Sequence, residues 1–338
     1  MDEKTLEALL GPLEWRGRID IEGGRLRILG SRHSDTRLEF TGQLTPSDMQ
    51  VQLGLPLAVR SASATIEQLV YEGGRVRAVC RIDDLYGTIA GRELSKASVL
   101  LTYVEPRLSI ENIQGELEGG ELRTLGGGAE RSGTAFSIDL EEPFPFQLAL
   151  DLRGIELAGL LRGLFASNFA TRGKFDGRLR LTGDTQRILA IQGSGSVQIA
   201  ESHLWSVPVF RALFSQLGLD DQAVFDQMGA NLRIKNGVLY TDDIWVSSPI
   251  LELVGKGWID FDGEVKEDLQ VRYRLIDRLG PFTRLLYAIQ EELLSVAIRG
   301  DLARPKVIFK APWTRISSDP RRYRSLPLPG FTPLPARF

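Results

Sequence analysis

Strict alternation of apolar and polar residues is the feature that most constrains how this chain folds. A period of two places successive side chains on opposite faces of a strand, so each run forms a strand with one apolar face. Such strands belong to antiparallel sheets, because parallel sheets are covered on both faces and carry nearly continuous apolar runs. The clearest runs are 49–53, 76–82, 136–140, 146–152, 179–181, 232–234, 269–275 and 307–309.

Tight-turn dipeptides separate the alternating runs. They are Gly23-Gly24, Gly73-Gly74, Gly119-Gly120, Asn236-Gly237 and Asp262-Gly263. Dipeptides of this kind join the two strands of a hairpin, so the sequence predicts a long meander of hairpins. We interpret adjacent carboxylates such as Asp83-Asp84 and Asp242-Asp243 as solvated turn residues rather than as catalytic pairs.

The number of expected strands, about fifteen to twenty, is more than an open twisted sheet carries without curling or splitting. Curling places the apolar face inside, either in a filled sandwich or barrel, or in a long groove with an apolar lining. We expect a mainly β fold in which a long antiparallel meander curls into an apolar-lined groove.

Three segments have helical rather than strand periodicity, with apolar residues at i, i+3, i+4 and i+7. We expect short amphipathic helices that cover the apolar face; the alternative is helices that bind a membrane surface or a partner. Their apolar residues are Leu157, Leu160, Leu161, Leu164 and Phe165 in the first, Phe210, Leu213, Phe214 and Leu217 in the second, and Phe282, Leu285, Leu286, Ile289 and Leu293 in the third.

Residues typical of catalytic and metal-binding sites are scarce in this sequence. The 338 residues include one cysteine, Cys80, and two distant histidines, His33 and His203, and no nucleophile elbow, metalloprotease or P-loop motif occurs. The stretch Gly193-Ser194-Gly195 lacks the third glycine of a dinucleotide fingerprint and leads into a strand. A net charge of −3 argues against nucleic acid as a partner. We therefore predict no catalytic, cofactor-binding or metal-ligating residue, no cofactor, and no enzymatic activity.

Apolar residues of the later runs are predicted to line the groove. They are Leu148, Leu150, Leu152, Leu179, Leu181, Val197, Ile199, Leu232, Ile234, Leu251, Leu253, Ile259, Phe261, Val271 and Tyr273.

Glycines interrupt this lining at two places. In the strand register, Gly193 and Gly195 share a face with Val197 and Ile199. The pair Gly255 and Gly257 repeats this arrangement beside Leu251, Leu253, Ile259 and Phe261. We hypothesise that these bare patches seat a plug, the helix 207–217 with Phe210, Leu213, Phe214 and Leu217, so that a bulky change such as Gly195→Leu would displace the helix or destabilise the fold.

The order of motifs from about residue 173 to residue 312 resembles the C-terminal region of the AsmA-like family, bacterial envelope proteins related to TamB. The strands at 106–113 and 119–122 resemble the repeated strand units of that family. The motifs that carry the resemblance are the strand 193–199, the proline-containing helix 208–217, and the segments 228–239, 244–248, 253–260 and 296–307.

The resemblance implies a β-groove in the periplasm that conducts phospholipids between the inner and outer membranes, with no catalytic residues. Family members are usually anchored by an N-terminal membrane helix, so the expected anchor to the inner membrane would be a segment absent from this chain. The expected organisation is a repeated-strand segment over 1–152, an AsmA-like groove with helices over 153–312, and an irregular tail over 313–338. The tail is rich in proline and arginine and could touch anionic lipid or a partner.

Three functions compete at this point. The first is a lipid-shielding envelope protein whose partners are phospholipid or another acyl lipid and proteins of the inner or outer membrane. The second is an assembly factor whose sheet edge pairs with strands of outer-membrane proteins. The third is a carbohydrate-binding or hydrolytic β module, which predicts aromatic residues grouped on one face, whereas the five tryptophans are scattered along the chain.

Overall fold

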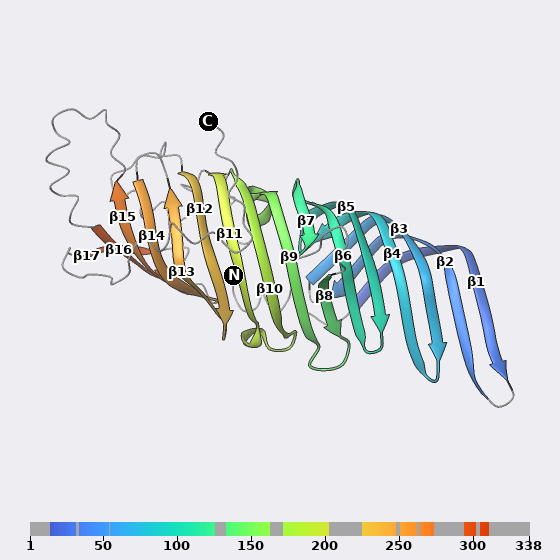
Figure 1. Ribbon diagram of the computed structural model, residues 1–338. Coiled ribbons are helices and arrows are strands. Elements are labelled where there is room, and N and C mark those ends of the chain that lie inside the picture. Colours follow the sequence, from blue (N-terminus) through green and yellow to red (C-terminus); the bar gives the residue numbers. More distant parts are fainter. Residues whose placement is uncertain are drawn as a thin grey trace. The chain divides into compact units, whose positions relative to one another are not determined.

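The computed structural model describes residues 14–31, 34–53, 55–125, 133–162, 172–202, 225–247, 251–261, 264–273, 294–301 and 305–310. Strands dominate these residues, so the mainly β prediction is confirmed (Figure 1). The chain divides into two compact units. One consists of residues 2–162 and 176–193, the N-terminal unit, and the other of Met1, 163–175 and 194–338, the C-terminal unit.

An antiparallel meander forms the N-terminal unit, as the alternation predicted. Each of the first six strands pairs with the next. Two short strands, β7 and β8, come next. They pair with successive parts of β6 and again with successive parts of β9, so together they occupy one strand position in the sheet. The strands are β1 (Glu14–Ser31), β2 (Ser34–Leu53), β3 (Leu55–Glu72), β4 (Arg75–Ile89), β5 (Arg92–Val104), β6 (Arg107–Leu117), β7 (Gly120–Thr124), β8 (Thr134–Asp139) and β9 (Pro145–Glu156).

The C-terminal unit repeats the meander. Its strands β12 (Phe225–Lys235), β13 (Val238–Ser247), β14 (Leu251–Asp260), β15 (Glu264–Tyr273), β16 (Leu294–Asp301) and β17 (Lys306–Lys310) pair antiparallel in chain order. Before them come β10 (Lys174–Asp184), the 3-10 turn η1 (Ile188–Ala190) and β11 (Gln192–Ser202), and the division between the units passes through β10 and β11.

Of the three predicted helices, the structure describes part of the first, as the five-residue helix α2 (Leu157–Leu161). Its expected continuation to Phe165 lies outside the described residues, as do the second and third predicted helices at 207–217 and 282–293 and the tail 313–338. The expected boundary after residue 152 falls inside β9.

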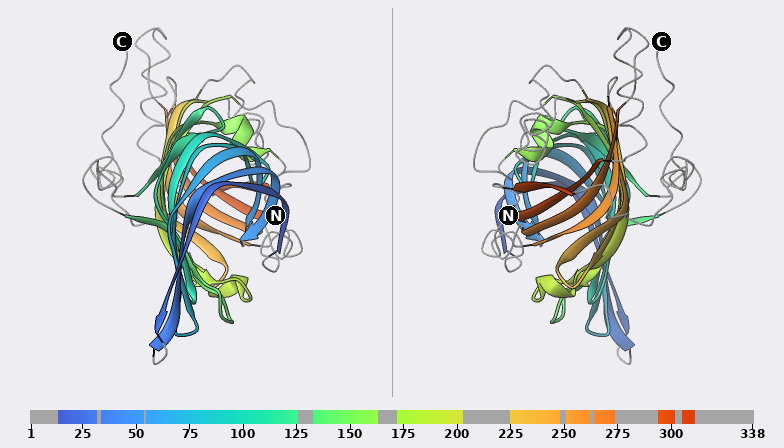
Figure 2. Two further views of the ribbon diagram at one scale, coloured as in Figure 1. Left: turned by 90° about the vertical axis from the view of Figure 1, so that its right-hand side faces the viewer. Right: turned by 90° about the vertical axis from the view of Figure 1, so that its left-hand side faces the viewer.

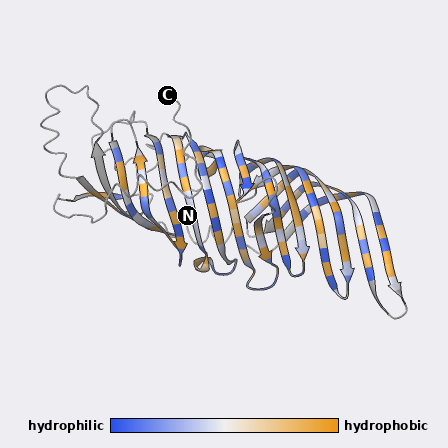
Figure 3. Ribbon diagram, viewed as in Figure 1, coloured by the Kyte–Doolittle hydropathy of each residue, from blue (hydrophilic) through white to orange (hydrophobic). Residues whose placement is uncertain are grey.

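Cross-strand register keeps the apolar residues of the N-terminal unit on one face, which we call the apolar face. Residues directly opposite each other in a sheet share a face, and the register carries one such row from Leu26 of β1 through Phe40 of β2 and Leu69 of β3 to Ala78 of β4. The row continues through Tyr103 of β5, Leu108, Ile138 and Phe146. Figure 3 shows the resulting alternation of hydrophobic and hydrophilic residues along each strand. The opposite face is mainly polar, although Val70, Val79 and Leu100 also lie on it.

β-Bulges cross the N-terminal unit in a row. Four non-glycine residues on β2, β4, β5 and β6 have a positive φ between 49° and 52°, namely Asp48, Asp84, Lys96 and Asn112. Each lies at a shift in the pairing register. Because a bulge bends its strand and increases its twist, a row of them curves the sheet, and the strands of this unit arch along their length (Figure 2).

The bulges correct one interpretation of the sequence. Asp83 and Asp84 lie within β4, and Asp242 and Asp243 lie within β13 at a second register shift. They are therefore strand residues at bulges rather than turn residues. Asp tolerates the left-handed backbone that turns and bulges share, so residue type alone does not separate the two.

The apolar face is well packed at one end. Val59, Leu85, Leu94, Ala97 and Leu117 are buried there. Close approach of β5 and β6 requires a glycine at this end, because a Cβ on Gly115 would lie 2.8 Å from the Cα of Ala97. Ile155 and Leu157, at the junction of β9 and α2, are also fully buried.

Thr124, at the end of β7, provides a test of this packing. It is 4% exposed, and its Oγ1 has no hydrogen-bond partner among the described residues. Since a buried hydroxyl without a partner is costly, Thr124→Val should raise the free energy of unfolding by about 1 kcal/mol. Urea unfolding would show a higher midpoint with an unchanged m-value. The matched change Thr65→Val, at an exposed position of β3, should have little effect; an equal or lower midpoint for Thr124→Val would contradict the prediction.

Candidate functional site

The candidate site is the apolar face of the N-terminal unit. Its residues change from buried at the packed end to half-buried further along the strands, for example at Cys80, Leu101, Leu108 and Ile110. Among the described helices and strands, only α2 covers part of this unit, and it contacts β5 and β9 at the packed end. Most of the face is therefore apolar surface that the described residues leave partly exposed.

The predicted lining residues of β9 lie on this face. Leu148 pairs with Phe136, Leu150 with Thr124, and Leu152 with Leu122. All three leucines are half-buried. The alternation thus placed these three side chains together correctly, while their contact with lipid remains a prediction.

In β10 and β11 the most buried side chains are not the most hydrophobic ones. Leu179 and Leu181 of β10 and Val197 and Ile199 of β11 are half-buried. The polar neighbours Ser196 and Gln198 are the buried residues of β11. The predicted role of Leu179, Leu181, Val197 and Ile199 in lining the groove stays a prediction.

Most of the remaining predicted lining residues share one face of the C-terminal unit. Between β14 and β15, Leu251 pairs with Tyr273 and Leu253 with Val271. On the other side of β14, Ile259 pairs with Leu239 of β13, which in turn pairs with Ile234 of β12. Leu253 is fully buried. Leu232 and Phe261 are half-buried, and the Phe261 N–H donates to the carbonyl oxygen of Gly237 at 2.9 Å.

The predicted glycine seats lie in strands as expected. Gly255 and Gly257 of β14 face Leu269 and Glu267 of β15. Gly193 lies against β10, because a Cβ there would approach the Leu181 Cδ2 to 2.5 Å and would also meet the Arg180 carbonyl oxygen. The neighbouring strand thus accounts for the glycine at 193 by itself. Gly195 is half-buried; the plug residues Phe210, Leu213, Phe214 and Leu217 lie outside the described residues, so the seat remains a hypothesis.

Ion pairs cover the polar face. The Arg107 guanidinium donates to both carboxylate oxygens of Asp139, at 2.6 and 3.1 Å, and joins β6 to β8. Lys96 and Glu116 join β5 to β6 at 2.9 Å. Hydrogen bonding from Arg107 lowers the pKa of Asp139, and hydrogen bonding from Lys96 lowers the pKa of Glu116. This face is thus internally paired in several places.

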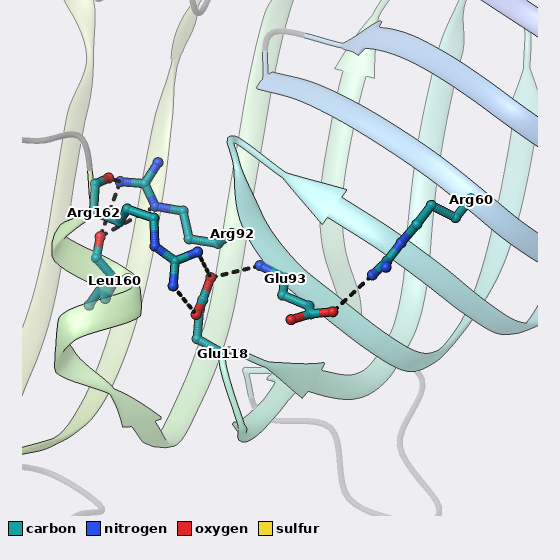
Figure 4. A network of polar contacts seen from close by, with 6 residues as sticks. All are labelled: Arg60, Arg92, Glu93, Glu118, Leu160 and Arg162. Atoms are coloured by element: carbon teal, nitrogen blue, oxygen red, sulfur yellow. Dashed lines mark hydrogen bonds and ion pairs between the residues drawn. The ribbon is translucent and has the colours of Figure 1, made fainter.

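A polar network fastens α2 to the packed end (Figure 4). Arg92 of β5 donates from Nη2 to the carbonyl oxygens of Leu160, at 3.1 Å, and Arg162, at 2.8 Å, which the end of the helix leaves without partners. Glu118 accepts the backbone N–H of Glu93 at 2.8 Å and pairs with Arg162 at 3.4 Å. Sequence reasoning missed Arg92, because its partners lie about seventy residues further along the chain and leave no local pattern.

Side chains that could ligate a metal ion do not cluster in the described residues. No group of three or more His, Cys, Asp or Glu side chains in this part of the chain could hold a metal ion. A search of the same residues for a helix long and apolar enough to cross a membrane finds none. Comparison with protein-family models, with curated proteins and with solved structures gives no significant match to this chain.

The Arg107–Asp139 pair predicts a pH dependence. Because the pKa of Asp139 is lower in the folded chain than its usual value of about 3.8, its carboxylate stabilises the fold above that value. The contribution is lost as the pH falls through the lowered pKa. Asp139→Asn should therefore lower the urea midpoint slightly near neutral pH, as expected for a partly exposed ion pair, and the difference from the unmodified protein should shrink at pH values below 3.8.

Glu141→Gln is the matched control, since Glu141 is an exposed carboxylate in the turn between β8 and β9. Its effect should be smaller at every pH. A midpoint difference for Asp139→Asn that persisted at low pH would show that the substitution acts through packing and not through the ion pair.

Proposed function

We propose that this protein is a non-enzymatic bacterial envelope protein that shields the acyl chains of phospholipids while they pass between the inner and outer membranes. The observation that carries the proposal is the apolar face itself. It continues through the paired strands β1 to β9, and its side chains remain part-exposed away from the packed end.

The chemistry of this face favours hydrocarbon as its ligand. Apolar surface left in water costs about 25 cal/mol per Å², and large exposed apolar patches on proteins commonly mark binding sites. Side chains such as Leu101, Leu108 and Ile110 offer no hydrogen bonds to a sugar or a nucleotide. An acyl chain needs none, so the face suits lipid tails.

The resemblance to the AsmA-like family supports the same conclusion. Its motifs coincide with paired strands: 193–199 lies in β11, 228–239 spans the β12–β13 hairpin, 253–260 lies in β14, and 296–307 spans β16 and β17. A family of periplasmic lipid conduits is thus consistent with the order and type of these elements. The periplasmic location and the membrane partners belong to this proposal.

An assembly factor that pairs with client strands is the alternative. It needs a sheet edge, and β1 supplies a long one (Figure 1). That alternative explains one strand, whereas lipid binding explains why the apolar face extends through all the strands of the N-terminal unit. We therefore prefer the lipid-shielding function.

Cys80 allows a direct test without a disruptive variant. This single cysteine lies on the apolar face between Ile66 of β3 and Leu101 of β5. Burial, with a smaller effect of Glu67, raises the pKa of its thiol, so its alkylation should be measured in mildly alkaline buffer. Vesicles of phosphatidylglycerol and phosphatidylethanolamine added to delipidated protein should slow alkylation of Cys80 severalfold.

A cysteine on the opposite face is the control. In Cys80→Ser/Thr102→Cys the thiol moves to the neighbouring strand, where Thr102 pairs with Val79 and Ser109 on the polar face. Lipid should leave its alkylation rate unchanged. Equal rates for Cys80 with and without lipid would refute lipid binding at this face, and equal protection of both thiols would indicate nonspecific coating.

Co-purified lipid gives a second test. Organic extraction followed by mass spectrometry should find phospholipid bound to the purified protein, and less of it in Ile110→Asn. An amide buried against an acyl chain costs about 1–3 kcal/mol, which is roughly fivefold to 150-fold in affinity. Ser109→Asn, one residue earlier on the polar face, should retain the lipid. Circular dichroism must show both variants folded; lipid-free protein, or equal loss from both variants, would count against the proposal.

A further inference from the structure

The outer edge of β1 differs from the interior of its sheet. β2 pairs with β1 along most of its length, and no other described strand of the unit makes comparable contact with it. Ile21, Leu26 and Ile28 on the apolar face are 63%, 60% and 67% exposed, whereas Leu38 and Phe40, their neighbours on β2, are half-buried. The exposure follows because the described residues place no second strand beside β1.

This edge has few of the features that protect natural edge strands. Such edges are usually short, or carry proline, lysine or inward-pointing charges. β1 has 18 residues and contains neither proline nor lysine. The register places all its charged residues on the polar face. Apart from its bulges, β1 has the composition of an interior strand.

Charge is distributed along β1 in a self-complementary way. Asp20 and Glu22 precede Gly23-Gly24, and Arg25 and Arg27 follow it. Residues three apart normally point to opposite faces of a strand. The bulge at Gly23-Gly24 adds one residue to β1, so residues three apart across the bulge point to the same face. Glu22 pairs with Gln43 and Arg25 with Thr41, so both lie on the polar face.

We propose that β1 pairs antiparallel with β1 of a second copy of this chain, about a two-fold axis between Gly23 and Gly24. In this register Glu22 faces Arg25 of the second copy. Asp20, which also accepts hydrogen bonds from Arg18 of its own strand at 3.0 and 2.9 Å, faces Arg27 of the second copy. On the apolar face Ile21 meets Leu26, and Ile19 meets Ile28. Apart from the central glycines, every opposed pair is either oppositely charged or apolar, and each occurs twice because of the two-fold symmetry.

The residues of β2 leave the central charges available for this contact. Gln43 and Thr41, opposite Glu22 and Arg25, are neutral. Glu39, opposite Arg27, already accepts a hydrogen bond from Arg37 at 2.9 Å. Pairing over ten residues buries less than the roughly 800 Å² per partner of a standard interface. The dimer should therefore dissociate on dilution and weaken with salt.

Sedimentation velocity of lipid-free protein over about 1–200 μM tests the proposal, a range suited to a weak interface. Unmodified protein should shift from monomer towards dimer. Arg25→Glu or Glu22→Arg alone should abolish the shift, because each places like charges opposite each other twice. The double variant Glu22→Arg/Arg25→Glu should restore dimerisation, and so should an equimolar mixture of the two single variants.

The control Arg75→Glu changes an exposed arginine in the β3–β4 hairpin and should dimerise normally. Monomer at every concentration would overturn the proposal. So would a dimer indifferent to the single reversals, or a failure of both the double variant and the mixture to recover it. Because no lipid is present, these results are independent of the alkylation tests of lipid binding at the apolar face.

Discussion

The structure of the N-terminal unit depends on the register between neighbouring strands. A slip of one residue would move a strand's apolar side chains to the polar face. The pairing instead keeps Leu26, Phe40 and Leu69 in one row that continues to β9. At bulges such as Gly23-Gly24 and Asp84 the register shifts, yet the apolar residues on both sides of the bulge remain on one face. The bulges therefore curve the sheet without breaking its apolar face.

A one-sided sheet places different demands on its two faces. The polar face is stabilised by its own cross-strand contacts, such as Arg107 with Asp139, and it needs only water. The apolar face needs cover. Among the described helices and strands α2, held by Arg92, supplies that cover, and it does so at the packed end. This asymmetry is the physical basis for proposing acyl chains as the ligand. It also explains why no sequence motif marks the proposed site, since binding of hydrocarbon would require an apolar pattern along many strands rather than a constellation of reactive groups.

The parts of this arrangement that arise from period two could be predicted from the sequence. Alternation is a local property, so it identified the strands and placed Leu148, Leu150 and Leu152 on one face. The sequence did not predict the bulges, because a positive φ at Asp84 depends on strand pairing and the same residue type is common in turns. Long-range features could not be predicted either. Examples are the contact of Arg92 with α2, and the deeper burial of Ser196 and Gln198 than of their apolar neighbours.

The two proposals meet at β1. A two-fold axis perpendicular to the sheet preserves its faces, so self-pairing would join the apolar face of one copy to that of the other without interruption. Ile21 and Ile28, which a single copy leaves exposed, would then become interior positions of a continuous hydrocarbon-lined surface. A parity change at Gly23-Gly24 makes this geometry possible, because without it Glu22 and Arg25 would lie on opposite faces. The bulge thus does more than bend an edge strand: it allows the same ten residues to match both the charges and the apolar side chains of a second copy.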